Sequence, residues 1–548
     1  MRSKVNSEIG HNPRLPRHRG LHSDGVRTAG FSPQIVSSGT GDPEGAPTSL
    51  KQPLRIMKFG GTSVADASCI QRVVEIIRAT ASEGNLVVVI SAMSGVTNKL
   101  IEAAVQSEHG NRESVAMIFA ELRAQHGAAL SALIQSDAKR NSIGQQMQEL
   151  FREGERLCEG TTLLHELTPR ARDAVSSLGE RLCAPLVAAV LEEGGIASQC
   201  IEATELVVTD SYYGRAEPWM DLTRERSTAR LQPVLQQGVV PVVTGFIGAT
   251  EDGVLTTLGR GGSDYSATIL GAALDADEVI IWTDVDGLLT ADPRLVPDAC
   301  LISEISYREA TELAYFGAKV LHPKTLHPVM QRGIPLRIRN TFAPEKSGTK
   351  ITPAGANNGG GVTALTAIHD AALITIGGPG LWGVQDVLGR TFATTTAARA
   401  DVLLISQSSA QNDICLVVSS SQAKRTLEAL RHEFSHDLAH EKVEHITLDG
   451  TVAIVTVVGE KVRAMAGIAG RMFRVLGRHN VEVIAIAYGA SACNISLVVA
   501  RKDVEAALLA SHREFHLGEL ASPMSPVGSG SSSVTWAYES GRTSPDAD

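Results

Sequence analysis

Short, largely apolar segments alternate with longer segments of helical periodicity between residues 54 and 338, and this alternation strongly constrains the fold. The apolar segments are 54–57, 86–90, 239–243, 278–282 and 334–338, and a long helical stretch covers 113–167. Strands buried on both faces of a parallel sheet have this composition, and helices connect them. The pattern predicts an α/β domain with a mostly parallel central sheet, in which ligands bind where the strands end.

The first of these strands runs directly into Lys-Phe-Gly-Gly-Thr-Ser (58–63), and helical periodicity begins at Val64. Two adjacent glycines let the backbone approach a ligand closely. Their amides and a helix N-terminus favour an anion, and Lys58 adds a full positive charge. An ordinary strand-to-helix turn with a solvated lysine is the alternative interpretation of this motif alone.

Other strand ends carry related segments. Ser-Ala-Met-Ser-Gly-Val-Thr-Asn (91–98) follows 86–90, Gly245 follows 239–243, and Thr-Asp-Val-Asp-Gly (283–287) follows 278–282. A second Gly-Gly pair lies in Gly-Arg-Gly-Gly-Ser-Asp (259–264), before a predicted helix over 266–274. A helix cap by Ser263 or Asp264 would also explain that last segment.

This combination of residues suits phosphoryl transfer, in which catalysis consists mostly of positioning and charge neutralisation. Two Gly-Gly loops, Lys58 and Arg260 are expected at one edge of the sheet. The P-loop motif and the H-R-D and D-F-G motifs of protein kinases are absent from the sequence. A carboxylate substrate needs no general base, because it is already ionised at neutral pH.

Length and composition narrow the other possibilities. The 548 residues suggest three or four domains, and a net charge of −10 gives no basic footprint for nucleic acid. Seven cysteines without a C-x-x-C pair fit a reducing compartment and argue against structural zinc. Because the sequence has no unbroken apolar run of about 18 residues, we expect no membrane partner.

The two ends of the sequence have a different composition from the rest. Residues 1–50 and 520–548 are rich in small and polar residues, and both are expected to be disordered. Residues 1–50 have no apolar core of a secretory signal, so the expected location is cytoplasmic. Organellar targeting by their arginines is the alternative, against which Asp24, Asp42 and Glu44 count.

The C-terminal part repeats itself after a predicted linker at 346–362. A shift of 81 residues aligns Arg390 with Arg471, Phe392 with Phe473, and 416–418 with 497–499, without a gap. This self-similarity predicts two copies of a βαββ-type unit, at 363–440 and 445–518.

Gly-Pro-Gly-Leu-Trp-Gly (378–383) matches the dinucleotide-binding pattern G-x-G-x-x-G. Its acidic partner, Asp401, begins a predicted strand, whereas the fingerprint needs an acid at a strand end. The second copy has Gly459, Lys461 and Ala464 at the equivalent positions. A nucleotide site here is therefore not expected.

Taken together, the motifs resemble those of the aspartate kinases in the amino acid kinase family. The matching segments lie in this order along residues 54–345: K-F-G-G-T-S-V (58–64), S-A-M-S-G-V-T-N (91–98), G-R-G-G-S-D-Y-S-A (259–267), W-T-D-V-D-G (282–287), A-D-P-R (291–294) and Y-F-G-A-K-V-L-H-P (315–323). The two repeats resemble paired ACT domains, which are βαββαβ modules that bind amino acids. In this family one ACT unit can interrupt the other, so their boundaries stay open.

The resemblance implies a reaction and its partners. The γ-phosphate of ATP would pass, with Mg²⁺, to the β-carboxylate of L-aspartate, which begins the synthesis of lysine, threonine and methionine. An amino-acid effector, threonine or lysine, would inhibit through the ACT units, and these units would build a homodimer or homotetramer. Magnesium is expected mainly on the ATP phosphates, with no protein metal site.

Residue roles also follow from the resemblance. Lys58, with Gly60 and Gly61, would hold the transferring phosphoryl group, and Asp264 would orient Lys58. Arg260 would bind the substrate α-carboxylate and Glu180 the α-ammonium. Further substrate contacts are expected at Ser91, Thr97 and Ser263. ATP or phosphate contacts are expected at Thr62, Gly261, Gly262, Thr283, Asp284, Arg294 and Lys319. Effector contacts are expected at Gly380, Val384, Gln407 and Asn494.

Some positions depart from the family pattern, and other functions stay open. Leu289 stands where some relatives have an aromatic residue, and Ala410 and Asp413 are less usual in the effector loop. A kinase of the same fold acting on glutamate, acetylglutamate, carbamate or UMP is the nearest alternative. A non-catalytic amino-acid sensor is another, and the kinase half of a fusion with homoserine dehydrogenase is a third.

Overall fold

The computed structural model describes residues 52–317, 320–356, 361–378, 385–407, 413–488 and 491–519. The two segments expected to be disordered, 1–50 and 520–548, lie outside these residues.

An eight-stranded sheet forms the centre of the first domain, with strands in the order β3-β4-β2-β1-β7-β9-β10-β8. Each neighbouring pair is parallel except β9 and β10. The mostly parallel sheet expected from the sequence is therefore confirmed. The strands are β1 (Leu54–Phe59), β2 (Asn85–Ile90), β3 (Ser198–Ile201), β4 (Val240–Thr244), β7 (Glu278–Thr283), β8 (Glu304–Ser306), β9 (Leu336–Asn340) and β10 (Thr349–Thr352).

Strand β1 lies between β2 and β7, and their register sets the position of the site. Lys58 lies beside Val89 of β2 and Ile281 of β7, within two residues of the end of each strand. Strand β4 ends level with β2, because Thr244 pairs with Ile90. The segments that follow β1, β2, β4 and β7 therefore meet at one edge of the sheet.

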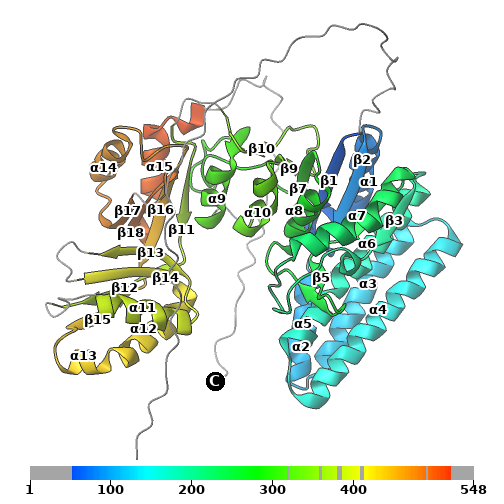
Figure 1. Ribbon diagram of the computed structural model, residues 1–548, viewed down its shortest axis with the longest axis horizontal. Coiled ribbons are helices and arrows are strands. Elements are labelled where there is room, and N and C mark those ends of the chain that lie inside the picture. Colours follow the sequence, from blue (N-terminus) through cyan, green and yellow to red (C-terminus); the bar gives the residue numbers. More distant parts are fainter. Residues whose placement is uncertain are drawn as a thin grey trace, which may run out of the picture. The chain divides into compact units, whose positions relative to one another are not determined.

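Helices cover both faces of this sheet (Figure 1). Met57, Phe59, Val88 and Ile90 face one layer, and Ile56, Val87 and Val89 face the other. The first layer contains α1 (Ala67–Ala81), α2 (Val96–Glu108), α3 (Arg112–Leu133), α4 (Asp137–Leu164), α5 (Pro169–Ser176) and α6 (Leu178–Glu193). The second contains α7 (Met220–Gln236), α8 (Gly262–Leu274), α9 (Tyr307–Tyr315) and α10 (Pro323–Arg332). A small hairpin, β5 (Ile247–Ala249) with β6 (Leu255–Thr257), follows β4.

The predicted linker at 346–362 is partly wrong, because β10 lies within it and pairs antiparallel with β9. The strand is held by burial of Ile351 and of Thr349, whose hydroxyl donates to the Ile302 carbonyl and accepts from the Leu288 amide. Only Ile351 is strongly apolar in the segment, so its sequence carried little sign of a strand.

The stretch Pro169–Glu193, comprising α5 and α6, is long and apolar enough to cross a membrane by length and composition alone, but 83% of its most apolar part is buried in the protein. Charged residues, including Arg172, Glu180 and Arg181, interrupt it, so it is not an unbroken apolar run. Its large apolar residues, such as Leu182 and Leu186, belong to the core under the sheet.

The C-terminal part forms two four-stranded antiparallel sheets. One consists of residues 371–449, which we call the inserted unit, with strand order β13-β14-β12-β15. The other combines β11 with residues 452–519, which we call the outer unit, with strand order β11-β16-β18-β17. Because β11 precedes the inserted unit but pairs with β16, the two units are interleaved. The elements are β11 (Ala364–Ile368), β12 (Ala371–Gly377), α11 (Gln385–Ala397), β13 (Val402–Gln407), β14 (Asp413–Ser419), α12 (Ser420–Glu433), α13 (Ser435–Ala439), β15 (His445–Asp449), β16 (Val452–Val458), α14 (Ile468–Arg478), β17 (Val483–Tyr488), β18 (Asn494–Ala500) and α15 (Val504–Glu514).

The 81-residue repeat is visible in three dimensions. Strands β12, β13 and β14 recur as β16, β17 and β18 with that displacement at both ends of each strand. Arg390 pairs with Glu433 at 2.7 Å and stacks over Phe434, and Arg471 pairs with Glu514 at 2.9 Å and stacks over Phe515. The two units thus share side-chain contacts as well as topology.

Candidate active site

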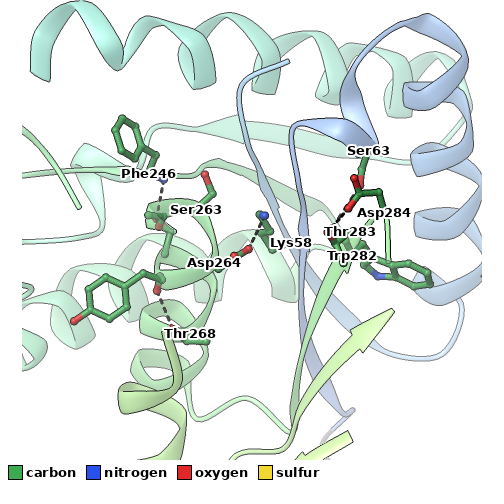
Figure 2. Close-up of polar contacts among 12 residues, drawn as sticks. Lys58, Ser63, Phe246, Ser263, Asp264, Thr268, Trp282, Thr283 and Asp284 are labelled. Carbon is green, nitrogen blue, oxygen red and sulfur yellow. Dashed lines mark hydrogen bonds and ion pairs between the residues drawn. The ribbon is translucent and has the colours of Figure 1, made fainter. Parts of the chain in front are cut away.

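Lys58 and Asp264 form a nearly buried ion pair at the edge where β1 meets α8. The Lys58 Nζ lies 2.5 Å from Asp264 Oδ1, and the two side chains are 10% and 14% exposed. Figure 2 shows the lysine reaching toward the first turn of α8, where Asp264 lies. Two residues far apart in the sequence are thereby fixed at the end of one strand, as their predicted roles require.

The glycine pair beside Lys58 packs closely against its surroundings. A Cβ at Gly60 would lie 3.3 Å from Lys58 Nζ, and one at Gly61 would lie 3.0 Å from the Ala92 carbonyl oxygen. The Gly60 amide donates to the Trp282 carbonyl, which ties the turn to β7. A side chain at Gly60 would therefore press on the Lys58 ammonium group, and one at Gly61 would crowd the backbone that follows β2.

The expectation that a helix begins directly at this turn is wrong. Thr62–Val64 form a single 3₁₀ turn, and α1 starts later, at Ala67. The Asp66 carboxylate accepts from the Cys69 amide and caps α1, and this hydrogen bond lowers the pKa of Asp66. Because a carboxylate already occupies the N-terminus of α1, the attraction for an anion at this edge rests mainly on Lys58.

Glu180 lies in the first turn of α6 and is only 3% exposed. One carboxylate oxygen accepts from the Ser263 hydroxyl at 3.5 Å, whereas Oε2 is buried without a hydrogen-bond partner among the described residues. Burial raises the pKa of Glu180 to about 8, although the backbone of Ala92, Ser263 and the charge of Lys58 act in the opposite direction. A buried, half-satisfied carboxyl group of this kind is suited to bind a cation.

Close packing brings Glu180 to the same edge as Lys58. A Cβ at Gly179 would lie 2.6 Å from the Ala92 Cβ, so the start of α6 packs against the segment that follows β2. Ser263 lies against Gly245, where a Cβ would meet the Ser263 side chain at 2.7 Å. Lys58, Asp264, Glu180 and Ser263 therefore form one cluster.

The other predicted substrate contacts lie around this cluster. Ser91 directly follows β2 and is buried, and its amide donates to the carbonyl of Phe59 at the end of β1. Thr97 lies half-buried in the first turn of α2. Arg260 is exposed between Gly259 and Gly261, both of which have positive φ. Burial, followed by the positive charges of Lys324 and Arg260, lowers the pKa of His322, which packs against Gly261.

The predicted nucleotide contacts follow β7. Thr283 ends the strand, and its hydroxyl donates to Asp284 at 3.2 Å (Figure 2). Arg294 is exposed and pairs with the Asp292 carboxylate, which belongs to the same A-D-P-R segment. Lys319 lies outside the described residues.

The sequence interpretation missed two residues that shape this edge. Phe246 has a φ of 69°, a conformation rarely adopted by a bulky residue, and its amide donates to the Ser266 hydroxyl in α8. Asp173 is buried and accepts from the amides of Gly214 and Thr257 and from the Thr257 hydroxyl, which fixes the segment before Gly259. The adjacent Gly-Phe-Ile-Gly motif was the one available signal for Phe246.

The predicted effector residues are only partly described. Gly380 and Val384 lie outside the described residues, and Gln407 is exposed at the end of β13. Asn494 begins β18, and its side-chain amide donates to the carboxylate of Glu312 in α9. The same carboxylate also accepts from the Ser491 hydroxyl at 2.6 Å. The loop of the outer unit is therefore tied to the first domain.

Among the described residues, no group of three or more His, Cys, Asp or Glu side chains is arranged to hold a metal ion.

Comparison with family models gives two matches. Residues 53–340 match the model described as "Amino acid kinase family", and residues 374–434 and 455–515 each match the model described as "ACT domain". The first match covers the Lys58 cluster and the sheet except for β10, and the other two lie within the inserted and outer units.

Similar curated proteins are aspartokinases, alone or fused to a second enzyme. Aspartokinase 1, chloroplastic, of Arabidopsis thaliana is 32% identical over 468 residues, which cover 84% of this chain and 80% of that protein. The bifunctional aspartokinase/homoserine dehydrogenase of Buchnera aphidicola is 31% identical over 479 residues, which cover 87% of this chain. The chain spans between 52 and 58% of the length of the bifunctional relatives that it matches.

Solved structures agree with these matches. Aspartokinase III of E. coli, solved in complex with aspartate and ADP, superimposes with a TM-score of 0.72 and 30% identity, covering 84% of this chain and all of that one. The same enzyme with lysine and aspartate gives a TM-score of 0.70.

Proposed function

The chain belongs to the amino acid kinase family and, within it, to the aspartokinases, and we propose that it transfers the γ-phosphate of ATP to the β-carboxylate of L-aspartate. The observation that carries this proposal is the buried Glu180 carboxyl group, with one unpartnered oxygen, in the same cluster as the Lys58–Asp264 pair. An amino-acid substrate brings an ammonium group for that oxygen, whereas N-acetylglutamate and UMP do not.

Each charged group of the cluster then has a part in the reaction. Glu180 and Arg260 would hold the α-ammonium and α-carboxylate, which leaves the β-carboxylate free to face Lys58. Lys58 would neutralise charge that builds on the transferring phosphoryl oxygens, and Asp264 would keep its ammonium group in place. The substrate carboxylate is ionised at neutral pH and attacks without a general base.

Magnesium would arrive with the nucleotide. Asp264 is the carboxylate beside Lys58, and it is already committed to that ion pair. Such an arrangement offers a divalent cation few protein ligands and fits a metal held mainly by ATP phosphates. Thr283, Asp284 and Arg294, with Lys319, would contact the nucleotide.

The inserted and outer units would make the enzyme responsive to an amino acid, threonine or lysine, as an end product of the pathway that the reaction opens. The support is the pair of ACT matches and the lysine bound to the E. coli relative. Association of these units into a homodimer or homotetramer and a cytoplasmic location complete the proposal.

An acceptor panel tests the reaction. Purified protein with Mg-ATP should release ADP when L-aspartate is added, and much more slowly with L-glutamate, N-acetylglutamate or UMP. Turnover with one of these other acceptors and none with aspartate would contradict the proposal. A non-catalytic sensor would release no ADP with any acceptor.

A further inference from the structure

The A-D-P-R segment lies at the tip of a hairpin formed by residues 288–302. Leu289 and Leu301 form an antiparallel bridge. The Thr290 amide donates to the Cys300 carbonyl, and the Thr290 hydroxyl accepts from the Cys300 amide. Arg294 stands at the exposed tip, beside Asp292. The orientation of this predicted nucleotide contact therefore depends on what holds the base of the hairpin.

The apolar side of the hairpin is buried in the outer unit. Ala291 and Val296 are 5% and 1% exposed and belong to the same apolar cluster as Leu508 of α15 and Leu365 of β11. Leu295 and Ala299 pack against that cluster as well. A segment of the kinase domain thus shares the core of a regulatory-type unit.

Two hydrogen bonds fix Thr290 to the outer unit. The His512 Nε2 of α15 lies 2.9 Å from the Thr290 hydroxyl oxygen, and the Thr290 carbonyl accepts from the Leu365 amide at 2.8 Å. Thr290 is 1% exposed and His512 is 2% exposed, so water cannot readily replace either bond. Burial lowers the pKa of His512, which favours the neutral imidazole. In that form Nε2 either donates or accepts one hydrogen bond with the Thr290 hydroxyl.

We propose that His512 is a positioning residue for the nucleotide, because it ties Thr290, and through it the Arg294 tip, to the outer unit. The inference rests on the proposed function only in taking Arg294 as a nucleotide contact. It adds that the affinity for ATP is set in part from α15, a helix that the kinase domain does not contain. His512 and Thr290 are not part of the Lys58–Glu180 cluster, so aspartate binding should be spared.

The test compares substitutions that remove the hydrogen bond with one that preserves it. Thr290→Val keeps the shape of the side chain and loses the hydroxyl, and His512→Leu removes the other partner. His512→Leu should raise KM for ATP and the dissociation constant of Mg-ADP by about 5- to 20-fold, the scale of one buried hydrogen bond left unpaired. Thr290→Val should raise both by at least as much, because it also loses the bond that the hydroxyl accepts from the Cys300 amide. KM for aspartate should stay within about twofold in both variants. His512→Gln, whose amide can still donate and accept, should restore most of the nucleotide affinity.

A matched control separates positioning from general loss of stability. Thr456→Val removes a buried hydroxyl from the same unit, where it bonds Ser496 of β18 at 2.9 Å. Nucleotide affinity should be unchanged in this variant. An unchanged ADP affinity in Thr290→Val, an equal rise in KM for aspartate, or the same loss in Thr456→Val would overturn the inference.

The binding measurement also keeps the two proposals apart. Wild-type protein that binds ADP but phosphorylates another acceptor would contradict the proposed substrate, while the variants would still decide the role of His512. Wild-type protein that binds no ADP would contradict both.

Discussion

Lys58 is the residue on which the chemistry of the site depends most. Its ammonium group lies at the end of β1, held by Asp264 and crowded by Gly60. A preorganised charge of this kind costs little reorganisation when the transition state forms, which makes it effective in catalysis.

Replacing Lys58 with alanine should lower kcat by about 10²-fold or more, the scale of losing one preorganised donor. Steady-state ADP release at saturating ATP and aspartate measures the change. Lys99→Ala is the matched control, because Lys99 of α2 pairs with Glu121 of α3 and its side chain is 37% exposed. A near-normal kcat in Lys58→Ala, or an equal loss in Lys99→Ala, would contradict the role given to Lys58.

Glu180 should make aspartate binding depend on pH. Its pKa of about 8 means that the carboxyl group is mostly protonated in the free protein below that pH. An ammonium group binds the ionised form, so each aspartate bound displaces one proton, and binding weakens as pH falls. We expect KM for aspartate to fall by up to about tenfold per pH unit between pH 6 and 8, and then to level off.

The control for this prediction is Glu180→Gln, which keeps the shape of the side chain and cannot ionise. It should bind aspartate weakly at every pH and lose the dependence. A KM for aspartate that is flat from pH 6 to 8 in the wild type would show that Glu180 does not receive the ammonium group.

Among single residues, the sequence predicted the site residues that belong to contiguous motifs. It missed the residues whose hydrogen-bond partners are distant in the sequence. Lys58, Ser263 and Asp264 stand in glycine-rich segments whose chemistry can be read directly. Asp173 accepts hydrogen bonds from the amides of Gly214 and Thr257, and no local sequence pattern predicts bonds between segments so far apart. The positive φ of Phe246 is likewise imposed by its surroundings.

At the scale of elements, the contact between α6 and the segment after β2 positions Glu180. The would-be Cβ at Gly179 lies 2.6 Å from the Ala92 Cβ, which is too close for two methyl groups. Gly179→Ala should therefore move α6 outward and lower the free energy of unfolding by about 1–3 kcal/mol. KM for aspartate should rise with it, because Glu180 follows directly in the chain.

A double substitution tests this contact. Ala92→Gly removes the opposing methyl group, so Gly179→Ala combined with Ala92→Gly should recover much of the lost stability. Thermal unfolding of the two single variants and the double variant measures the coupling. Purely additive effects would mean that the two residues do not press on each other.

Local periodicity was enough to predict β1, β2, β4 and β7 within two residues, because these strands are mostly buried and apolar. Strand β9 was also predicted within two residues, although only Leu336 and Ile338 are buried and apolar. The helical stretch predicted at 113–167 consists of two helices, α3 and α4, separated near Ser136, which caps α4. The family resemblance left interleaving of the predicted units 363–440 and 445–518 open, and the structure shows it: β11 pairs with β16 of the outer unit, and β15 pairs with β12 of the inserted unit. The sequence alone did not show these pairings, because strand pairing across more than 80 residues leaves no local trace.

At the scale of the whole molecule, the repeat places two similar regulatory units on one kinase domain. The 81-residue shift matches Gln407 with Tyr488, and both are exposed where their strands end. It also matches Asp413 with Asn494, whose side-chain amide donates to Glu312 of α9. Because Asn494 of the outer unit is already bonded to the first domain, we take Gln407 of the inserted unit as the effector contact to test.

Threonine or lysine should therefore inhibit the enzyme, with a coupling free energy of about 1–3 kcal/mol. Gln407→Ala should relieve the inhibition and leave the uninhibited kcat nearly unchanged. Titration of each amino acid at subsaturating aspartate measures both effects. Gln422→Ala is the control, because Gln422 also lies in the inserted unit, where its side chain hydrogen-bonds to Asp401. An equally sensitive Gln407→Ala, or no effect of either amino acid on the wild type at millimolar concentration, would contradict this account.

In the proposed reaction, Glu180 and Arg260 hold the α-groups of aspartate so that its β-carboxylate meets the phosphoryl group beside Lys58. Trapping the product with hydroxylamine and locating the hydroxamate by mass spectrometry tests this arrangement. We expect aspartate β-hydroxamate, formed only with ATP present and lost in Lys58→Ala. Formation of the α-hydroxamate, or of no hydroxamate from aspartate while glutamate yields one, would contradict it.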